Sequence, residues 1–326
     1  MARSTGTRLL GVALGAAAAV PAVLAGFSAF TARKVLEAVP QAGRLLQIGG
    51  ETLHVSDTGG DKPAILLLHG LGGNMLNLLP GLSPLLSRDY RVVAIDRPDS
   101  GYSVGAPGRP GNIRAQAWVV RDVIEALGLR KPLVVGHSLG GAIALATALD
   151  HPAQVGGLAL LTPLTQVETV PPKMFAALAV RNPVKRWLIS WTLAVPLGIR
   201  RGRRTMEMVF APEALPRDFA VTGGGLLNMR PSAYRSASRD LVASGDDLPG
   251  LVARYPSLGV PVGILFGTED RVLAPWKHGA AMKALVPDLV YEEIAGAGHM
   301  LPFTQPEPTA AFIRKMAEKV AEQPAA

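Results

Sequence analysis

A five-residue turn between an apolar run and an alanine-rich run constrains the fold of this chain more than any other feature. Residues 133–135 are apolar, Gly136-His137-Ser138-Leu139-Gly140 follow, and residues 141–146 are rich in alanine. This order is typical of a buried strand that turns sharply into a helix and holds its serine at the helix N-terminus. Glycines on either side permit a tight turn, and the positive end of the helix favours a developing anion. We therefore interpret Ser138 as a candidate nucleophile.

A serine nucleophile needs a base, and the base needs a carboxylate to orient it. In an open parallel sheet these groups come from loops at the carboxyl ends of later strands. An apolar run at residues 262–266 leads into a loop with Glu269 and Asp270, and a second run at 289–294 leads to His299. The order predicts His299 as general base and acid, with the carboxylate of residue 269 or 270 orienting it.

The loop after a third apolar run, at residues 64–68, supplies the remaining part of such a site. It reads His69-Gly70-Leu71-Gly72-Gly73, and its glycines let the main chain approach a substrate closely. An oxyanion hole needs two backbone N–H groups. We expect one from Leu139, directly after the nucleophile, and one from Leu71, with Gly72 as the alternative donor. We expect His69 to support this loop through hydrogen bonds.

These motifs occur in a fixed order, together with a segment that reads Asp96-Arg97-Pro98-Asp99-Ser100-Gly101-Tyr102-Ser103. In this respect the chain resembles the α/β-hydrolase superfamily, in the branch that carries a helical lid. The resemblance implies a doubly wound, mostly parallel sheet with helices on both faces and an inserted helical lid. It also places the orienting acid at Asp270 rather than Glu269. Asp99 departs from the pattern, because the family more often has glycine there.

The same resemblance separates this chain from relatives with other chemistries. Dehalogenases and epoxide hydrolases of this superfamily use an aspartate nucleophile, where this chain has Ser138. Dehalogenases usually follow the nucleophile with a halide-binding tryptophan, where this chain has Leu139. We therefore expect a serine hydrolase that cleaves a hydrophobic carboxylic ester through an acyl-enzyme. The same triad also suits thioesters and carbon–carbon bonds in diketone-like compounds, and a non-catalytic ligand-binding homologue is a further alternative.

Composition removes several other classes of protein. The chain has no cysteine, so it has no disulfide framework, and its histidines lack the spacing of a metal site. We expect no cofactor and no metal. The net charge of +8 lies mostly in two segments: residues 1–44 carry 5 basic and 1 acidic side chains, and residues 163–256 carry 13 and 7. No recognised nucleic-acid-binding fold accompanies this charge, so we expect no nucleic-acid partner.

The N-terminal segment, residues 1–44, is expected to be a membrane anchor and linker. Residues 9–30 contain no charged side chain, and 22 helical residues are long enough for the roughly 30 Å of a hydrocarbon core. A cleaved signal peptide, with secretion, and a soluble helix are the alternatives. Basic residues lie on both sides of the segment. We expect Arg3 and Arg8 in the cytoplasm and the catalytic domain on the extracytoplasmic side.

The remaining chain divides into a hydrolase core, residues 45–162 and 257–326, and a helical lid, residues 163–256. About a hundred residues separate two expected core strands, which is far more than an ordinary crossover requires. Within the lid, Trp187 and Trp191 stand among basic residues. This pattern fits an anionic lipid interface. It equally fits tryptophans that pack over the active site beside solvated arginines.

Overall fold

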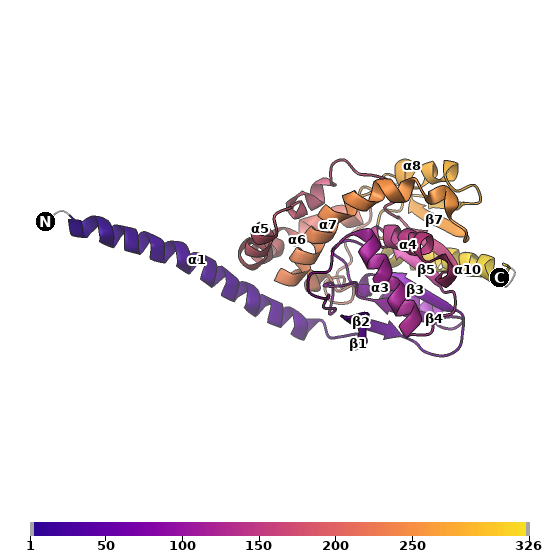
Figure 1. The fold of residues 1–326 in the computed structure, drawn as a ribbon, viewed down its shortest axis with the longest axis horizontal. Helices are drawn as coiled ribbons and strands as arrows, with labels where there is room; N and C mark the ends of the chain where they lie inside the picture. The colour runs from indigo at the N-terminus through magenta and orange to yellow at the C-terminus, as the bar shows by residue number, and fades with distance from the viewer. Residues whose placement is uncertain (1–2, 324–326) are drawn as a thin grey trace.

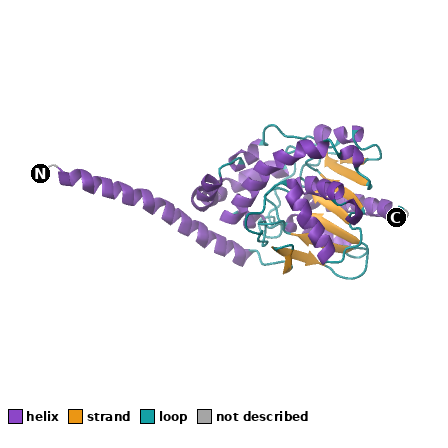
Figure 2. Ribbon diagram, viewed as in Figure 1, coloured by secondary structure: helices purple, strands orange, loops and turns teal. Residues whose placement is uncertain are grey.

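The computed structural model describes residues 3–323, with side chains from residue 19 onward, and shows one eight-stranded sheet between layers of helices (Figures 1 and 2). The strand order is β1-β2-β4-β3-β5-β6-β7-β8. The strands from β3 to β8 run parallel to one another, while β2 lies antiparallel to both β1 and β4. The expected doubly wound, mostly parallel sheet is confirmed. The strands are β1 (Arg44–Ile48), β2 (Glu51–Asp57), β3 (Ala64–Leu68), β4 (Arg91–Ile95), β5 (Leu133–His137), β6 (Gly157–Leu161), β7 (Val262–Gly267) and β8 (Val290–Ile294).

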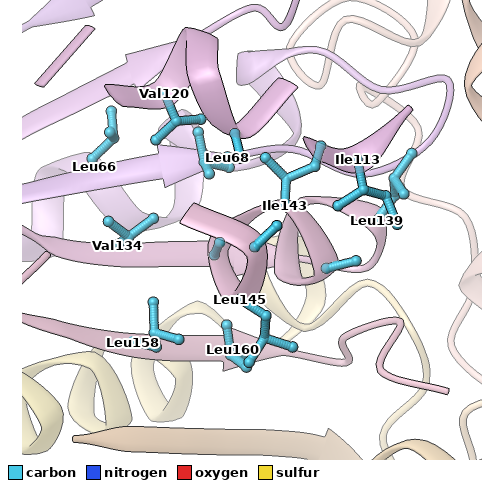
Figure 3. Packing of buried hydrophobic residues seen from close by; sticks show 14 of the residues in the cluster. Leu66, Leu68, Ile113, Val120, Val134, Leu139, Ile143, Leu145, Leu158 and Leu160 are labelled. Carbon is cyan, nitrogen blue, oxygen red and sulfur yellow. The ribbon is translucent and has the colours of Figure 1, made fainter. Parts of the chain in front are cut away.

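Helices cover both faces of the sheet because its central strands are apolar on both sides. In β3, Leu66 and Leu68 pack toward α3 (Ile113–Ala126) and α4 (Leu139–Asp150). Ile65 and Leu67 pack in the opposite direction, toward α2 (Leu79–Leu86) and α10 (Pro306–Ala321). Figure 3 shows the first of these two cores around β3, β5 and β6. Full burial of one such side chain contributes about 1.5–3 kcal/mol, and this two-sided burial explains why the strands are continuous apolar runs.

The segment between β6 and β7, residues 162–261, is largely helical. Here it is called the β6–β7 insertion. Its main helices are α5 (Pro183–Ile189), a π turn (Ser190–Ala194), α6 (Val195–Phe210) and α7 (Pro231–Val252). Prolines begin these helices more than they break them: Pro183, Pro196 and Pro231 all occupy the first turn of a helix, where a missing N–H leaves no hydrogen bond unmade. The division of the chain into a core, residues 45–162 and 257–326, and a lid, residues 163–256, stays a prediction.

The N-terminal helix α1 (Arg3–Ala38) extends from the body of the molecule, and its C-terminal part lies beside the insertion (Figure 1). Val35 and Val39 are buried against Leu227, and the Tyr102 hydroxyl donates to the carbonyls of Leu36 and Val39. Farther toward the N-terminus, Ser28 is fully buried, whereas residues 19–23 are exposed. The side chains of Arg3 and Arg8, on which the expected orientation depends, lie outside the described residues.

The stretch Ala19–Ala38 is long and apolar enough to cross a membrane, with a mean hydropathy of 1.3 and 11% of the stretch buried. Pro21 lies inside the helix without ending it. Length and composition of this kind are shared by membrane anchors and signal sequences.

Candidate active site

Ser138 occupies a sharp turn between β5 and α4. Its backbone has φ 54° and ψ −120°, a region that residues with a side chain rarely adopt and that the surrounding packing must enforce. The packing is tight enough to require glycine at both flanks. A Cβ on Gly136 would lie 2.4 Å from the carbonyl oxygen of Gly140, and a Cβ on Gly140 would lie 2.3 Å from that of Leu68. The turn therefore presents Ser138 at the N-terminus of α4, where its side chain remains partly accessible.

Asp270 and His299 meet at the carboxyl ends of β7 and β8. The His299 Nδ1–H donates to Asp270 Oδ2 at 2.7 Å, and both residues are buried. The other carboxylate oxygen of Asp270 accepts the N–H groups of Val272 and Leu273, at 2.8 and 3.0 Å. Glu269 has a half-exposed side chain that faces Arg271 at 3.7 Å. The structure thus places Asp270, and not Glu269, against the imidazole.

Hydrogen bonds hold the main chain of His299 beside the serine turn. Its carbonyl oxygen accepts hydrogen bonds from His137 Nε2 and Thr162 Oγ1, both at 3.0 Å, and the His137 and His299 rings lie 4.9 Å apart. No hydrogen bond between the Ser138 hydroxyl and the His299 ring is recorded among the described residues. Such bonds commonly form only when substrate is bound. The roles of His137 and Thr162 were not expected from the sequence, because nothing local marks a partner more than 130 residues away.

His137 is a neutral, fixed donor in this arrangement. Burial lowers the pKa of His137 to about 3, and the nearby His299 is the second cause of this shift. Its Nε2 faces a carbonyl, which only accepts, so the proton resides on Nε2. Its Nδ1 is buried and has no hydrogen-bond partner among the residues that the structure describes. Proton transfer through His137 therefore does not fit its surroundings.

The loop after β3 approaches Ser138 closely. A Cβ on Gly70 would lie 2.9 Å from the Ser138 Cβ, so glycine is required for this approach. Leu71 and Leu139 line the same cavity as Ser138. The N–H of Leu139 opens α4, and the first N–H groups of a helix lack partners within it. Both expected oxyanion donors thus belong to segments that border the nucleophile.

His69 supports this loop with both ring nitrogens. Its Nδ1–H donates to the Gly70 carbonyl at 2.9 Å, and its Nε2 accepts the N–H of Arg97 at 2.9 Å. Burial, reinforced by the positive charge of Arg97, lowers the pKa of His69 well below its usual value. These contacts agree with a supporting role for His69.

Arg97 is fully buried beneath the same loop and links it to the β6–β7 insertion. Its guanidinium donates to the carbonyls of His69 and Gly70, at 3.0 and 2.8 Å, and pairs with Asp240 of α7 at 2.9 Å. Gln116 accepts a further hydrogen bond from it. Arg97 stands in a motif of the sequence, but its role could not be predicted there because Asp240 is 143 residues away.

Asp99, the departure from the family pattern, adopts the left-handed conformation that favours glycine, with φ 62°. Its carboxylate accepts the N–H of Gly105 at 2.9 Å and pairs with Arg239 of α7 at 2.7 Å. The loop therefore keeps the turn that a glycine would adopt, and it gains two contacts that glycine lacks.

A cavity of about 210 Å³ opens next to Ser138, between the core and the insertion. Most of its walls are apolar, and its polar residues lie mainly on the insertion. The Glu168 carboxylate pairs with Lys277 at 2.8 Å and accepts a hydrogen bond from His278 Nε2 at 2.6 Å. Neither Trp187 nor Trp191 lines this cavity, so the structure does not support tryptophans packed over the active site. The apolar lining comprises Leu71, Leu139, Leu164, Pro171, Pro172, Phe175, Ala179, Leu241, Val242, Leu248, Val272 and Leu273.

Comparison with known proteins settles the family. A family model described as the alpha/beta hydrolase family matches residues 65–312, which include every segment of the site described above. The chain belongs to the alpha/beta hydrolase family. Among curated relatives, a 2-hydroxy-6-oxononadienedioate/2-hydroxy-6-oxononatrienedioate hydrolase from a Pseudomonas species is 27% identical over 263 residues, covering 76% of this chain and 85% of the relative.

Solved structures of other hydrolases share the fold. A membrane phospholipase A, described as a bacterial virulence factor, aligns with a TM-score of 0.64 at 24% identity and covers 97% of both chains. A thermophilic esterase from Thermogutta terrifontis aligns with a TM-score of 0.65 at 23% identity, covering 83% of this chain and 94% of the esterase. At these identities the similarity shows the fold, and the family includes esterases and carbon–carbon bond hydrolases alike.

Proposed function

We propose that this protein is a serine hydrolase that cleaves a hydrophobic carboxylic ester through an acyl-enzyme. The observation that carries the proposal is the Asp270–His299 pair, fastened beside the strained turn that presents Ser138. In this mechanism Ser138 attacks the acyl carbon while His299 takes its proton and returns it to the leaving alcohol. Asp270 orients the imidazole, and the N–H groups of Leu139 and Leu71 bind the oxyanion. Water then releases the acid.

The cavity supports an apolar acyl or alcohol group in the substrate. Its walls beside Ser138 are leucine, phenylalanine, proline and valine side chains. Burial of a hydrocarbon chain against them is favourable by roughly 25 cal/mol per Å² of apolar surface. We therefore expect the ratio kcat/KM to rise with acyl length among p-nitrophenyl esters until the chain exceeds the cavity.

Covalent labelling tests the nucleophile. A fluorophosphonate probe is expected to label the wild-type protein and not Ser138→Ala, and that variant is expected to lower kcat on p-nitrophenyl esters by about 10⁴-fold or more. Ser244→Ala is the matched control, because Ser244 lines the same cavity away from the turn. Labelling that survives in Ser138→Ala, or is lost in the control instead, contradicts the assignment. An unlabelled wild-type protein favours a non-catalytic homologue.

Carbon–carbon bond hydrolysis is the second candidate, because the Pseudomonas relative named above carries that activity in its name. The cavity lining argues against a substrate with two carboxylates. Arg181 is the one basic residue that lines the cavity within the described part of the chain, and Glu168 lies in the same lining. Assay of the dienedioate named for that relative, beside the ester panel, distinguishes the two activities.

Attachment to a membrane through α1 is a further part of the proposal. It is supported by the uncharged stretch of residues 9–30 and by the exposure of residues 19–23. The fold it shares with a membrane phospholipase A over nearly the whole chain agrees with it. We propose that the catalytic domain lies on the extracytoplasmic side, with a cleaved signal peptide as the alternative.

A further inference from the structure

One side of the β6–β7 insertion exposes a row of large apolar side chains. Val184 and Leu188 are four residues apart on α5, and Leu193 and Leu197 are four apart across the start of α6. The π turn between them completes the row, because a π turn aligns residues five apart, as Leu188 and Leu193 are. Each of the four is between 42% and 64% exposed, and Trp187 beside them is 53% exposed. These four residues are called the apolar row.

Cations continue this face beyond the end of the apolar row. Arg200, Arg201 and Arg204 follow Leu197 by three, four and seven residues, so they share its side of the helix. All three are exposed, and none takes part in an ion pair among residues 19–323. Lys185 adds an exposed cation at the opposite end. A row of aliphatic side chains and a tryptophan, with three arginines at one end and a lysine at the other, matches the chemistry of an anionic lipid interface.

The packing of α1 against the insertion determines how deep this face lies relative to the proposed membrane-spanning stretch. The π turn and α6 pack against α1. Burial along the described part of α1 begins at Leu24 and includes Ser28, whereas the uncharged stretch ends at Phe30. The insertion therefore meets α1 at the end of the stretch proposed to cross the bilayer, and the rest of α1 projects past it (Figure 1). With that stretch in the hydrocarbon core, the apolar row lies at the membrane surface.

We propose that the apolar row and its flanking arginines dock into the anionic lipid interface of the membrane that α1 enters. This inference rests on the proposed anchoring, and it adds a second, reversible contact on the insertion itself. The contact places the cavity near the source of a lipid-soluble substrate. Arg181, which lines the cavity, lies only three residues before Val184. An apolar ester can then pass from the membrane surface to Ser138 with little exposure to water.

Fluorescence from single tryptophans in the full-length chain tests the docking. One variant keeps only Trp187, through W118F, W191F and W276F. The matched control keeps only Trp276, which is 73% exposed on α8 (Pro275–His278), across the globular body from α5 (Figure 1). Both are placed in vesicles of phosphatidylcholine and phosphatidylglycerol that contain chain-brominated lipid. We expect bromine to quench Trp187 emission by about half or more and to leave Trp276 emission unchanged.

A second arm tests the charges. The variant R200Q/R201Q/R204Q is expected to lower the quenching of Trp187 in anionic vesicles to the level found in pure phosphatidylcholine vesicles. The control R88Q/R130Q/K319Q removes three exposed cations elsewhere and is expected to keep the full quenching. Both triple variants are expected to keep wild-type turnover of a short, soluble p-nitrophenyl ester, so loss of docking is distinguishable from loss of hydrolysis.

Two results overturn the proposal. In the first, the chain floats with the vesicles through α1 while Trp187 is quenched no more than Trp276. In the second, Trp187 emission shifts to shorter wavelength without quenching by brominated lipid, which shows that protein, such as a second copy of the chain, covers the row instead of lipid.

Discussion

His137 is held one residue before Ser138 and reaches His299 through the main-chain carbonyl of that residue. This hydrogen bond holds the main chain of His299 in place. The position of that main chain determines how closely the imidazole can approach the serine hydroxyl. Small displacements of a catalytic group change rates strongly, by about 10²-fold for 1 Å. We therefore infer that His137 is a positioning residue whose N–H, and not its charge, matters.

Two substitutions separate these properties. His137→Gln keeps an N–H that can donate to the carbonyl, and His137→Leu removes it. We expect kcat on a p-nitrophenyl ester to fall by about 10- to 100-fold in the leucine variant and to remain near wild type in the glutamine variant. Equal kcat values in the leucine variant and the wild type contradict the positioning role.

The same residue predicts a dependence of stability on pH. Its pKa is about 3 in the folded protein and has an ordinary value of 6.5 when exposed. Between these two pH values the unfolded chain binds a proton at His137 that the folded chain does not bind. The contribution of His137 to the free energy of unfolding is therefore full above pH 6.5 and is lost as pH falls toward 3. The expected slope is about 1.4 kcal/mol per pH unit. Urea unfolding between pH 7 and 5 is expected to show this slope reduced in His137→Gln, while His69 contributes equally to both proteins.

At the scale of elements, the ion pair of Arg97 and Asp240 connects the loop after β3 to α7. Both side chains are about 1% exposed, so removal of Asp240 leaves the buried Arg97 guanidinium without its ion-pair partner. We expect Asp240→Leu alone to lower the free energy of unfolding by about 3–5 kcal/mol. The double variant Arg97→Met/Asp240→Leu is expected to lose less than the sum of the single variants, as measured by urea unfolding. Additivity within about 0.5 kcal/mol contradicts the coupling.

At the scale of the whole molecule, the proposed anchor predicts where the protein is found in a cell. We expect the full-length chain to remain with membranes after extraction at alkaline pH. Val20→Arg/Val23→Arg places two charges near the middle of the uncharged stretch, at about 2.5–3.5 kcal/mol each, and is expected to release it. Val170→Arg, an equally exposed position on the insertion, is expected to remain with membranes. Mass spectrometry of a soluble mature chain that begins after this stretch favours the signal peptide instead.

The sequence predicted the core strands well because their signals are local. β3 is found at Ala64–Leu68 and β7 at Val262–Gly267, within one residue of the apolar runs, since strands buried on both faces contain little but apolar residues. The serine turn directly follows β5, and the loops that hold Asp270 and His299 follow β7 and β8. The contacts of His137 and Thr162 with His299, and of Arg97 with Asp240, could not be predicted, because each joins segments more than 100 residues apart.

The π turn at Ser190–Ala194 holds one residue more than an α-helical path of the same height requires. That extra residue determines how α6, which follows it, is rotated about its helix axis. Deleting a single residue there would turn α6 by about 100° around its own axis, and so carry Leu197 and the three arginines toward a flank of the molecule. The length of this short segment thus determines, as much as the side chains themselves do, which residues of α6 lie on the exposed face of the insertion.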